Sequence, residues 1–311
     1  MGRSQSQQSC ARAELWLQER ISVEMGADGF DLSAALRILL GYWICECVLQ
    51  SAAAPRGVTE LMRHVESRLC TQSGARNFEP LRYDARLLLL AHHILSVCGC
   101  RTYGIETFAQ QLAAAVKERL IVPLRCVGEA LLLARLGYGE YPPIPTLEPR
   151  DAGTDAFCLL RGDEEQILSV CQNIGAATHF GSQRLRATAG VRSYLGHMLP
   201  IILLQSMREY NLELGALVLR TIRYLRITGN QALSVAISFL MDQQLVDGRF
   251  GHFGIEAAKI SELEGKDSSQ VANELYLPIT VSCLWTLAEV GKVNLFSLPR
   301  PQWANRGRNC C

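Results

Sequence analysis

The chain has 311 residues, of which 49% are hydrophobic and 20% charged, a composition typical of a globular protein. Its 31 Lys and Arg residues nearly balance its 30 Asp and Glu residues, and the formal net charge is +1. Because binding to nucleic acid needs a clustered basic surface, this balance argues against nucleic acid as a partner. The arginines between 184 and 226 are spaced along helical stretches, which indicates a solvated helix face.

The two ends of the chain lack a helical pattern. Residues 1–10 are polar with no apolar segment behind them of the kind a secretory signal has, and residues 298–311 combine Pro, Gly and Arg. We expect a disordered N-terminus over 1–10 and a flexible tail over 298–311. Gly2 and the pair Cys310–Cys311 fit short lipidation patterns that also occur by chance.

No apolar run approaches the ~18 residues that span a bilayer. We therefore expect no transmembrane segment and a cytoplasmic location. The twelve cysteines mostly lie in apolar helical stretches of a large chain, so we expect buried, reduced thiols rather than a disulfide framework.

Between the two ends, apolar and amphipathic stretches alternate, which predicts helices joined by turns. The first stretch begins at Ala11, and Asp31 is a natural N-cap for the second. The helical stretches of the N-terminal half lie at 11–21, 31–52, 57–69, 79–99, 104–120 and 122–139. A Pro-rich loop near 138–153 follows and cannot be helical. The helical stretches of the C-terminal half lie at 163–181, 194–210, 212–227, 236–251 and 276–293.

Strand patterns are nearly absent, so the sequence predicts an all-α fold over 11–297 as a single domain. The apolar helices carry a proline at or near their start, with spacings close to one or two units of about 40 residues. These prolines are Pro80, Pro123, Pro200 and Pro278. Apolar helices that alternate with amphipathic ones suggest an inner and an outer layer, as in an α/α toroid or a helical-hairpin solenoid.

The stretch from Ala236 to Gly251 reads AISFLMDQQLVDGRFG and resembles the QW motif of class II terpene cyclases and protein prenyltransferase β subunits. The motif residues are matched by Ala236, Phe239, Leu240, Gln244 and Gly248, and Phe250 stands where the motif has Trp. The resemblance implies an α/α toroid in which inner helices surround a central cavity. In physical terms, Gln244 can satisfy backbone groups of the turn, Gly248 permits a left-handed conformation, and Phe250 can pack back onto the helix.

The catalytic residues of those families do not carry over. The Asp-x-Asp-Asp string of the cyclases is missing, and the zinc-binding His of the prenyltransferases would fall at Ile279. The Cys-Cys-His zinc ligands of the lanthionine cyclases are missing as well. His92, His93 and the Cys-x-Cys pairs at 45–47 and 98–100 are better explained as core residues, because Cys-x-Cys in a helix points its thiols apart. We expect no metal and no cofactor.

The candidate site residues lie in the turn that leads to the 276–293 helix and at the start of that helix. Asp247, His252, Glu274 and Tyr276 would rim the cavity mouth of a toroid and perform acid–base chemistry or bind a polar ligand end. The alternative is that Asp247 forms the turn and the others, with Arg249, are solvated rim residues. Asp84, beside Tyr83, has the same status near another inner helix.

Two functions follow from these patterns. The first is a toroid-like binding or accessory protein that holds a peptide, a protein partner or an apolar small molecule, within a biosynthetic pathway. The second is a toroid-fold enzyme, a cyclase or lyase without metal, that uses the rim residues on an apolar or peptide substrate. The missing catalytic motifs favour the first function.

Overall fold

The structure is a computed structural model in which residues 5–26, 31–49, 56–72, 85–97, 103–117, 127–140, 142–143, 145–152, 159, 163–252, 254 and 271–291 are described. These residues form helices joined by turns. The extended pairings among them are two isolated bridges, Thr146 with Arg186 and Gln244 with Phe250. The prediction of an all-α protein is confirmed.

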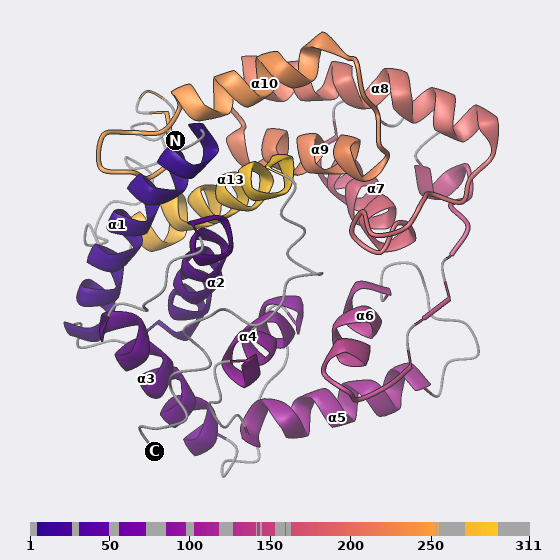
Figure 1. The fold of residues 1–311 in the computed structure, drawn as a ribbon. Helices are drawn as coiled ribbons and strands as arrows, with labels where there is room; N and C mark the ends of the chain where they lie inside the picture. Colours follow the sequence, from indigo (N-terminus) through magenta and orange to yellow (C-terminus); the bar gives the residue numbers. More distant parts are fainter. Residues whose placement is uncertain are drawn as a thin grey trace.

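Six of the described helices pack side by side in a closed succession around a common centre (Figure 1). Helix α2 contacts α4, then α4 contacts α6, α6 contacts α7, α7 contacts α9, α9 contacts α13, and α13 returns to α2. We call these the inner helices: α2 (Leu32–Leu49), α4 (Ala85–Val97), α6 (Val127–Arg135), α7 (Glu164–Ala177), α9 (Leu212–Tyr224) and α13 (Leu277–Val290).

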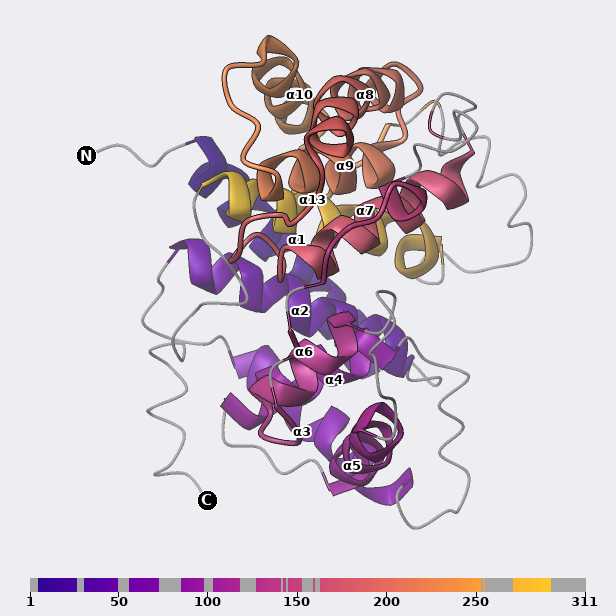
Figure 2. The same ribbon diagram turned by 90° about the vertical axis from the view of Figure 1, so that its right-hand side faces the viewer.

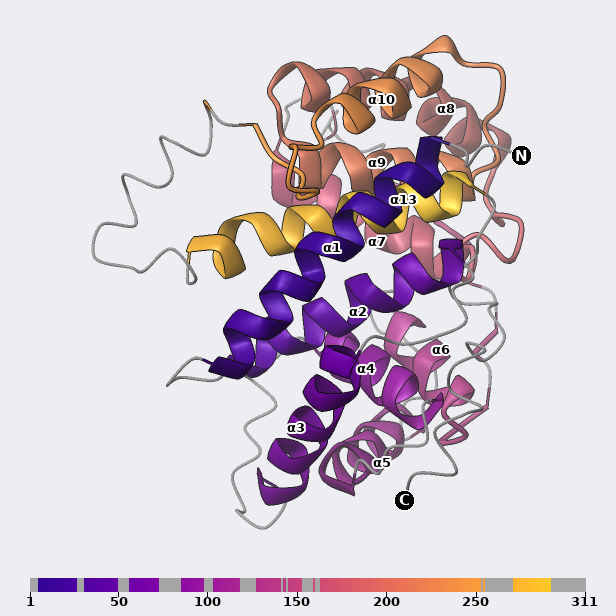
Figure 3. The same cartoon turned by 60° about the vertical axis from the view of Figure 1, so that its left-hand side comes forward.

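Five further helices lie outside this succession, and we call them the outer helices. They are α1 (Gln5–Gly26), α3 (Arg56–Gln72), α5 (Tyr103–Lys117), α8 (Ala189–Arg208) and α10 (Gln231–Asp242). Helix α1 packs on α3 and α3 on α5, while α8 packs on α10. Figure 3 shows α1 crossing in front of α2 and α13, both of which it contacts.

Local sequence signals explain where several helices begin. The Asp31 carboxylate accepts hydrogen bonds from the backbone N–H groups of Ser33 (2.8 Å) and Ala34 (3.2 Å), as expected of an N-cap. Asp163 caps α7 in the same way. Pro278 lies in the first turn of α13, where its missing N–H costs no helical hydrogen bond.

The N-terminal helix begins earlier than the sequence pattern indicated. Helix α1 starts at Gln5, so it includes residues 5–10, for which we predicted disorder. The reason is tertiary, because Ser9 is 2% exposed and Cys10 is fully buried against the rest of the fold. Gly2 and the predicted tail over 298–311 lie outside the described residues, as do Pro80 and Pro123.

The prediction for Pro200 is wrong. Pro200 lies in the middle of α8 rather than near the start of a helix, and α8 is an outer helix despite its apolar sequence. Two of its large apolar side chains remain in solvent, with Ile201 53% and Leu204 45% exposed. Apolar composition alone therefore does not separate the inner from the outer layer.

The outer layer has no helix between α5 and α8 among the residues that the structure describes. Between α6 and α7, which Figure 2 shows from this side, the described residues form turns and the short 3-10 helix η3 (Arg150–Ala152). This segment includes the described part of the predicted Pro-rich loop near 138–153.

Helix α2 meets the length and composition of a membrane-spanning helix, so our expectation about apolar runs is wrong at this point. Its 18 residues have a mean hydropathy of 1.6, and 78% of them are buried inside the protein. Arg37 and Glu46 interrupt the apolar run, which is why the sequence pattern did not indicate a helix of this hydropathy. In the fold, α2 is covered by α1, α3, α4 and α13.

Candidate functional site

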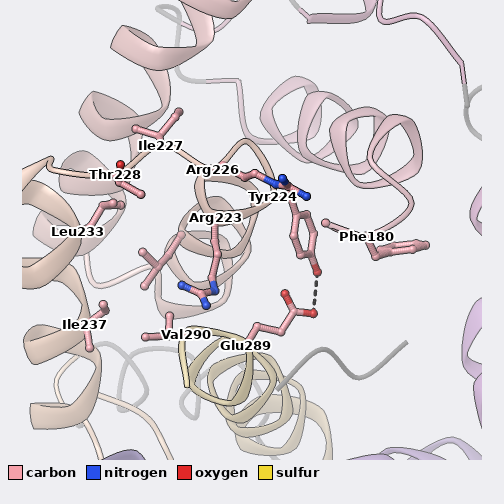
Figure 4. Close-up of a pocket in the computed structure, with 12 residues that line it drawn as sticks. Phe180, Arg223, Tyr224, Arg226, Ile227, Thr228, Leu233, Ile237, Glu289 and Val290 are labelled. Carbon is pink, nitrogen blue, oxygen red and sulfur yellow. Dashed lines mark hydrogen bonds between the residues drawn. The ribbon is translucent and has the colours of Figure 1, made fainter. Parts of the chain in front are cut away.

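A cavity of about 360 Å³ lies where the C-terminal ends of two inner helices, α9 and α13, meet the start of α10 (Figure 4). Its wall combines apolar and charged side chains from these helices and from the turn after α7. The lining residues are Phe180, Gly181, Leu219, Arg223, Tyr224, Arg226, Ile227, Thr228, Leu233, Ile237, Glu289 and Val290.

A turn with three successive left-handed residues builds one side of the cavity. The φ angles of His179, Phe180 and Gly181 are 46°, 52° and 81°, and the first two are unfavourable for residues with a Cβ atom. The Thr178 hydroxyl holds this turn, because it donates to α7 carbonyls and accepts from the Gly181 N–H at 3.1 Å. A Cβ atom on Gly181 would lie 2.6 Å from the Tyr224 ring, so only glycine allows this packing.

The floor of the cavity is a buried carboxyl group on α13. Glu289 is 5% exposed, and its Oε1 atom accepts hydrogen bonds from the Tyr224 hydroxyl at 2.9 Å and from Trp285 Nε1 at 2.8 Å. Burial raises the pKa of Glu289 to about 7, although the nearby positive charges of Arg220 and Arg223 and the two hydrogen bonds act in the opposite direction. The carboxyl group therefore titrates close to neutral pH.

Arg220 stabilises the same cluster from α9. Its guanidinium lies 4.6 Å from the centre of the Trp285 ring, a cation–π contact, and its side chain is buried. This corrects the prediction that the arginines of this region form a solvated face, which holds for Arg223 and Arg226 but not for Arg220.

Two of the residues predicted as a rim site, Asp247 and Tyr276, are connected through Arg249 at the opposite end of α13. Asp247 accepts a hydrogen bond from the Arg249 backbone N–H at 3.1 Å, and its carboxylate pairs with the Arg249 side chain at 3.2 Å. The Arg249 guanidinium in turn lies 4.0 Å from the centre of the buried Tyr276 ring. Asp247 is thus a turn former, as the alternative interpretation expected.

The other two predicted residues, His252 and Glu274, have different surroundings. His252 stacks on Tyr210 with ring centroids 3.9 Å apart, and Glu274 is exposed in the π-helical turn η5 (Ala272–Tyr276) that precedes α13. The described cavity lies at the C-terminal end of α13, about 20 Å away along a helix of this length. Asp84 and Tyr83 lie outside the described residues.

Gln244 and Gly248, between α10 and α13, have the architectural roles that the sequence predicted. Gln244 Nε2 donates hydrogen bonds to the Gly248 carbonyl and to the Ser9 carbonyl of α1, both at 2.8 Å. Gly248 has a φ of 101°, and a Cβ atom there would lie 2.1 Å from the backbone of Arg12. Phe250 is fully buried, with its N–H donating to the Thr280 hydroxyl at 3.0 Å.

The histidine pair His92–His93 and the described cysteines pack in or against the core. His92 is buried and contacts the Tyr138 hydroxyl at 3.1 Å, and burial lowers the pKa of His92 to about 4. His93 packs edge-on against Trp43. The prediction of buried thiols is confirmed for four of the described cysteines, while Cys47 is half-buried. Those buried are Cys10, Cys45, Cys171 and Cys283.

Sequence reasoning did not single out Glu289, Tyr224 or Trp285 as site residues. One signal was present, because Glu289 is the only charged residue in the α13 segment LPITVSCLWTLAEV, and an acid in an apolar helix needs a partner. Its partner Tyr224 lies 65 positions earlier, which no local pattern predicts.

Comparison of the chain with protein-family models, with characterised proteins and with solved structures finds no match.

Proposed function

We propose that the protein is a binding protein with an α/α-toroid fold, and that it holds an apolar small molecule in the cavity between α9, α10 and α13. The toroid assignment is supported by the closed succession of inner helices, by the outer helices around them and by the QW-like frame at Gln244, Gly248 and Phe250.

The cavity is the observation that carries the binding function. Its volume of about 360 Å³ falls in the range of ~300–1,000 Å³ that small-molecule pockets occupy. This is the liquid volume of about 12 water molecules, which favours a small molecule over a peptide as the ligand. Leu219, Leu233, Ile237 and Val290 provide apolar wall, and Glu289 provides a polar group of the kind that fixes ligand orientation.

A toroid-fold cyclase or lyase is the second candidate function, and one observation favours it. The pKa of Glu289, raised to about 7, suits proton transfer near neutral pH. The alternative acids of such an enzyme are Asp247 and Glu274 at the other end of α13. Under the binding function, Asp247→Asn and Glu274→Gln leave ligand binding in the cavity unchanged, whereas an enzyme that uses them loses turnover.

The binding function is tested with a tryptophan that fills the cavity. Ile237 lines the cavity from α10, whereas Val235 on the same helix is 51% exposed. We expect the neutral fluorophore N-phenyl-1-naphthylamine to bind the wild-type protein, and Ile237→Trp to weaken its Kd at least about tenfold because the added ring occupies the site. Val235→Trp is the matched control and retains binding.

The fluorescence titration also has an outcome that contradicts the proposal. If the fluorophore binds Ile237→Trp as tightly as Val235→Trp, then it binds elsewhere and the cavity is not the ligand site. Circular dichroism of both variants confirms that each is folded, since the described residues are mostly helical.

A further inference from the structure

Two arginines at the cavity have no ion pair with an acidic residue that the structure describes. Arg223 and Arg226 both line it, both side chains are exposed, and neither forms an ion pair with an acidic residue that the structure describes. Figure 4 shows the Arg223 side chain directed from α9 toward Glu289 and Val290 on α13. A basic residue in the last turn of a helix also stabilises the helix dipole, but that role does not require a cavity beside it.

One oxygen of the buried Glu289 carboxyl group, opposite Arg223, accepts no hydrogen bond from the described residues. Glu289 Oε1 accepts both hydrogen bonds, from Tyr224 and Trp285, and Oε2 accepts none from the described residues. Glu289 lines the cavity. Its Oε2 atom does not belong to the fully buried polar atoms that lack a hydrogen bond, so this oxygen is accessible from the cavity. An open polar atom on a side chain that is 5% exposed is a place for a ligand group.

The charge balance decides which ligand group fits. The positive groups that act on Glu289 come from α9, namely Arg220 and Arg223, and Arg226 follows α9 at the cavity wall. Beyond Trp285, the neighbouring inner helices present Arg135 and His93, and burial lowers the pKa of the His93 imidazole, which favours its neutral form. The surroundings are therefore positive, which disfavours a cationic ligand group and favours an anion.

A single negative charge fits better than a double one. A protonated Glu289 can donate its proton from Oε2 to an anion, whereas an ionised Glu289 repels the anion. A carboxylate beside a carboxylic acid shares one proton with it, as paired acids in proteins do. A dianionic phosphate would place two negative charges beside the same carboxyl group.

We propose that the cavity takes an apolar monocarboxylate, with its carboxylate between Arg223 and Glu289 and its hydrocarbon chain along α10. This inference rests on the proposed binding function and names the ligand class for the same cavity. The carboxylate accepts hydrogen bonds from the Arg223 guanidinium and from the Glu289 carboxyl, while Leu233 and Ile237 contact the chain. Binding then takes up a proton at neutral pH.

The first experiment compares four ligands of one chain length by displacement of N-phenyl-1-naphthylamine. These are hexanoate, hexan-1-ol, hexylamine and hexyl phosphate. Because hydrogen bonds to a charged group add roughly 1.5–3 kcal/mol, we expect hexanoate to bind about tenfold to a hundredfold more tightly than the alcohol and the amine. Equal affinity of hexanoate and hexan-1-ol overturns the inference, and tighter binding of hexyl phosphate reassigns the site to phosphate.

The second experiment tests the two side chains. Arg223→Ala is expected to weaken hexanoate binding about tenfold and to leave hexan-1-ol unaffected. Arg208→Ala, at an exposed position of α8, is the matched control and changes neither affinity. If Arg223→Ala weakens both ligands equally, then the guanidinium supports the cavity rather than the anion.

The third experiment uses pH. A simple carboxylate stays ionised above about pH 6, so a change in hexanoate affinity between pH 6 and 8 reports a proton on the protein. We expect affinity to fall as pH rises, by at most about tenfold per unit. Glu289→Gln places the amide donor Nε2 where Oε2 stands and does not titrate, so its affinity for hexanoate is independent of pH. A pH dependence that persists in Glu289→Gln contradicts the role of Glu289.

These outcomes separate the ligand class from the binding function itself. If the neutral fluorophore does not bind the wild-type protein, or binds Ile237→Trp normally, then the binding function fails first. If the fluorophore behaves as expected but hexanoate shows no advantage over hexan-1-ol, then only the monocarboxylate assignment fails.

Discussion

Two glutamates on inner helices show how a buried carboxyl group is accommodated in this fold. Glu289 lies beside the cavity, whereas Glu46 lies between α2 and α1 and is 3% exposed. The Tyr42 hydroxyl donates a hydrogen bond to Glu46 Oε1 at 3.0 Å. Burial raises the pKa of Glu46 to about 7, the Tyr42 hydrogen bond lowers it, and the nearby charge of Glu14 raises it further.

The pKa of Glu46 predicts how stability depends on pH. Its ordinary value is 4.5, so between pH 4.5 and about 7 the folded protein binds more protons at this site than the unfolded chain. The free energy of unfolding therefore falls as pH rises through this window, by about 3 kcal/mol from Glu46 alone, and is constant above it.

Replacing Glu46 with the neutral amide removes this contribution. We expect Glu46→Gln to gain stability relative to the wild type as pH rises from 5 to 8, by up to about 3 kcal/mol, because Gln keeps an oxygen that accepts from Tyr42. Urea unfolding at pH 5, 6, 7 and 8 measures this difference. Glu19→Gln, at an exposed position of α1, is the control. Parallel curves for Glu46→Gln and the wild type would contradict the assignment.

At the scale of the element, the sequence predicted the helices and the turn between α10 and α13 well. The roles of Asp31, Gln244 and Gly248 follow from local chemistry, because a cap, a turn amide and a left-handed glycine act within a few residues of themselves. The early start of α1 does not follow from local chemistry, since Ser9 in this segment is contacted by Gln244, which is distant in sequence.

The candidate site was predicted less well, for a related reason. Asp247 and Tyr276 were chosen because they precede or begin the 276–293 helix, where a toroid has its cavity mouth. Their side chains contact Arg249 rather than line the described cavity. Glu289 and Tyr224 were missed because their pairing depends on how α9 packs on α13. The placement of α8 in the outer layer likewise depends on packing, which a uniformly apolar sequence does not specify.

Gln244 connects the motif to the first helix, and this contact can be tested. Gln244→Ala removes two hydrogen bonds at a buried position, to Ser9 and Gly248, and leaves their carbonyls without these donors. We expect a loss of about 2–3 kcal/mol in the free energy of unfolding. We also expect faster amide hydrogen exchange in the first two turns of α1.

The neighbouring Gln243 supplies the control for this measurement. Gln243 is half-buried at the C-cap of α10, and the contact to α1 is made by Gln244. Gln243→Ala should therefore leave exchange in α1 unchanged. Equal acceleration in both variants would show that the turn, and not the Gln244 amide, holds α1 in place.

At the scale of the whole molecule, the contact of α13 with α2 closes the succession of inner helices. Gly41 lies at this contact, where a Cβ atom would be 3.1 Å from Leu17 of α1 and 3.2 Å from Val281 of α13. The absence of a side chain thus lets three helices approach one another. Glycine costs helix stability at this position, and the packing compensates for it.

A larger side chain at this position should separate the three helices. We expect Gly41→Leu to lower the free energy of unfolding by about 3 kcal/mol, because the side chains of Leu17 and Val281 occupy the space. Gly196 of α8 is the matched control, since a Cβ atom there meets no atom within 4 Å. Gly196→Leu should be neutral or stabilising by up to about 1 kcal/mol. Thermal unfolding followed by circular dichroism distinguishes these outcomes.

The packing of α13 onto α2 also determines when the chain can complete its fold during synthesis. Helices α1 and α2 leave the ribosome before α13, so the part of their cover that α13 supplies arrives only with residues 277–290. The buried hydrogen bond from Arg20 to Asn273 spans 253 positions of sequence. Contacts of this separation form late and slowly, because a long loop must close first. A nascent chain that ends before α13 therefore exposes the apolar face of α2, and this is the stage at which we expect chaperones to bind it.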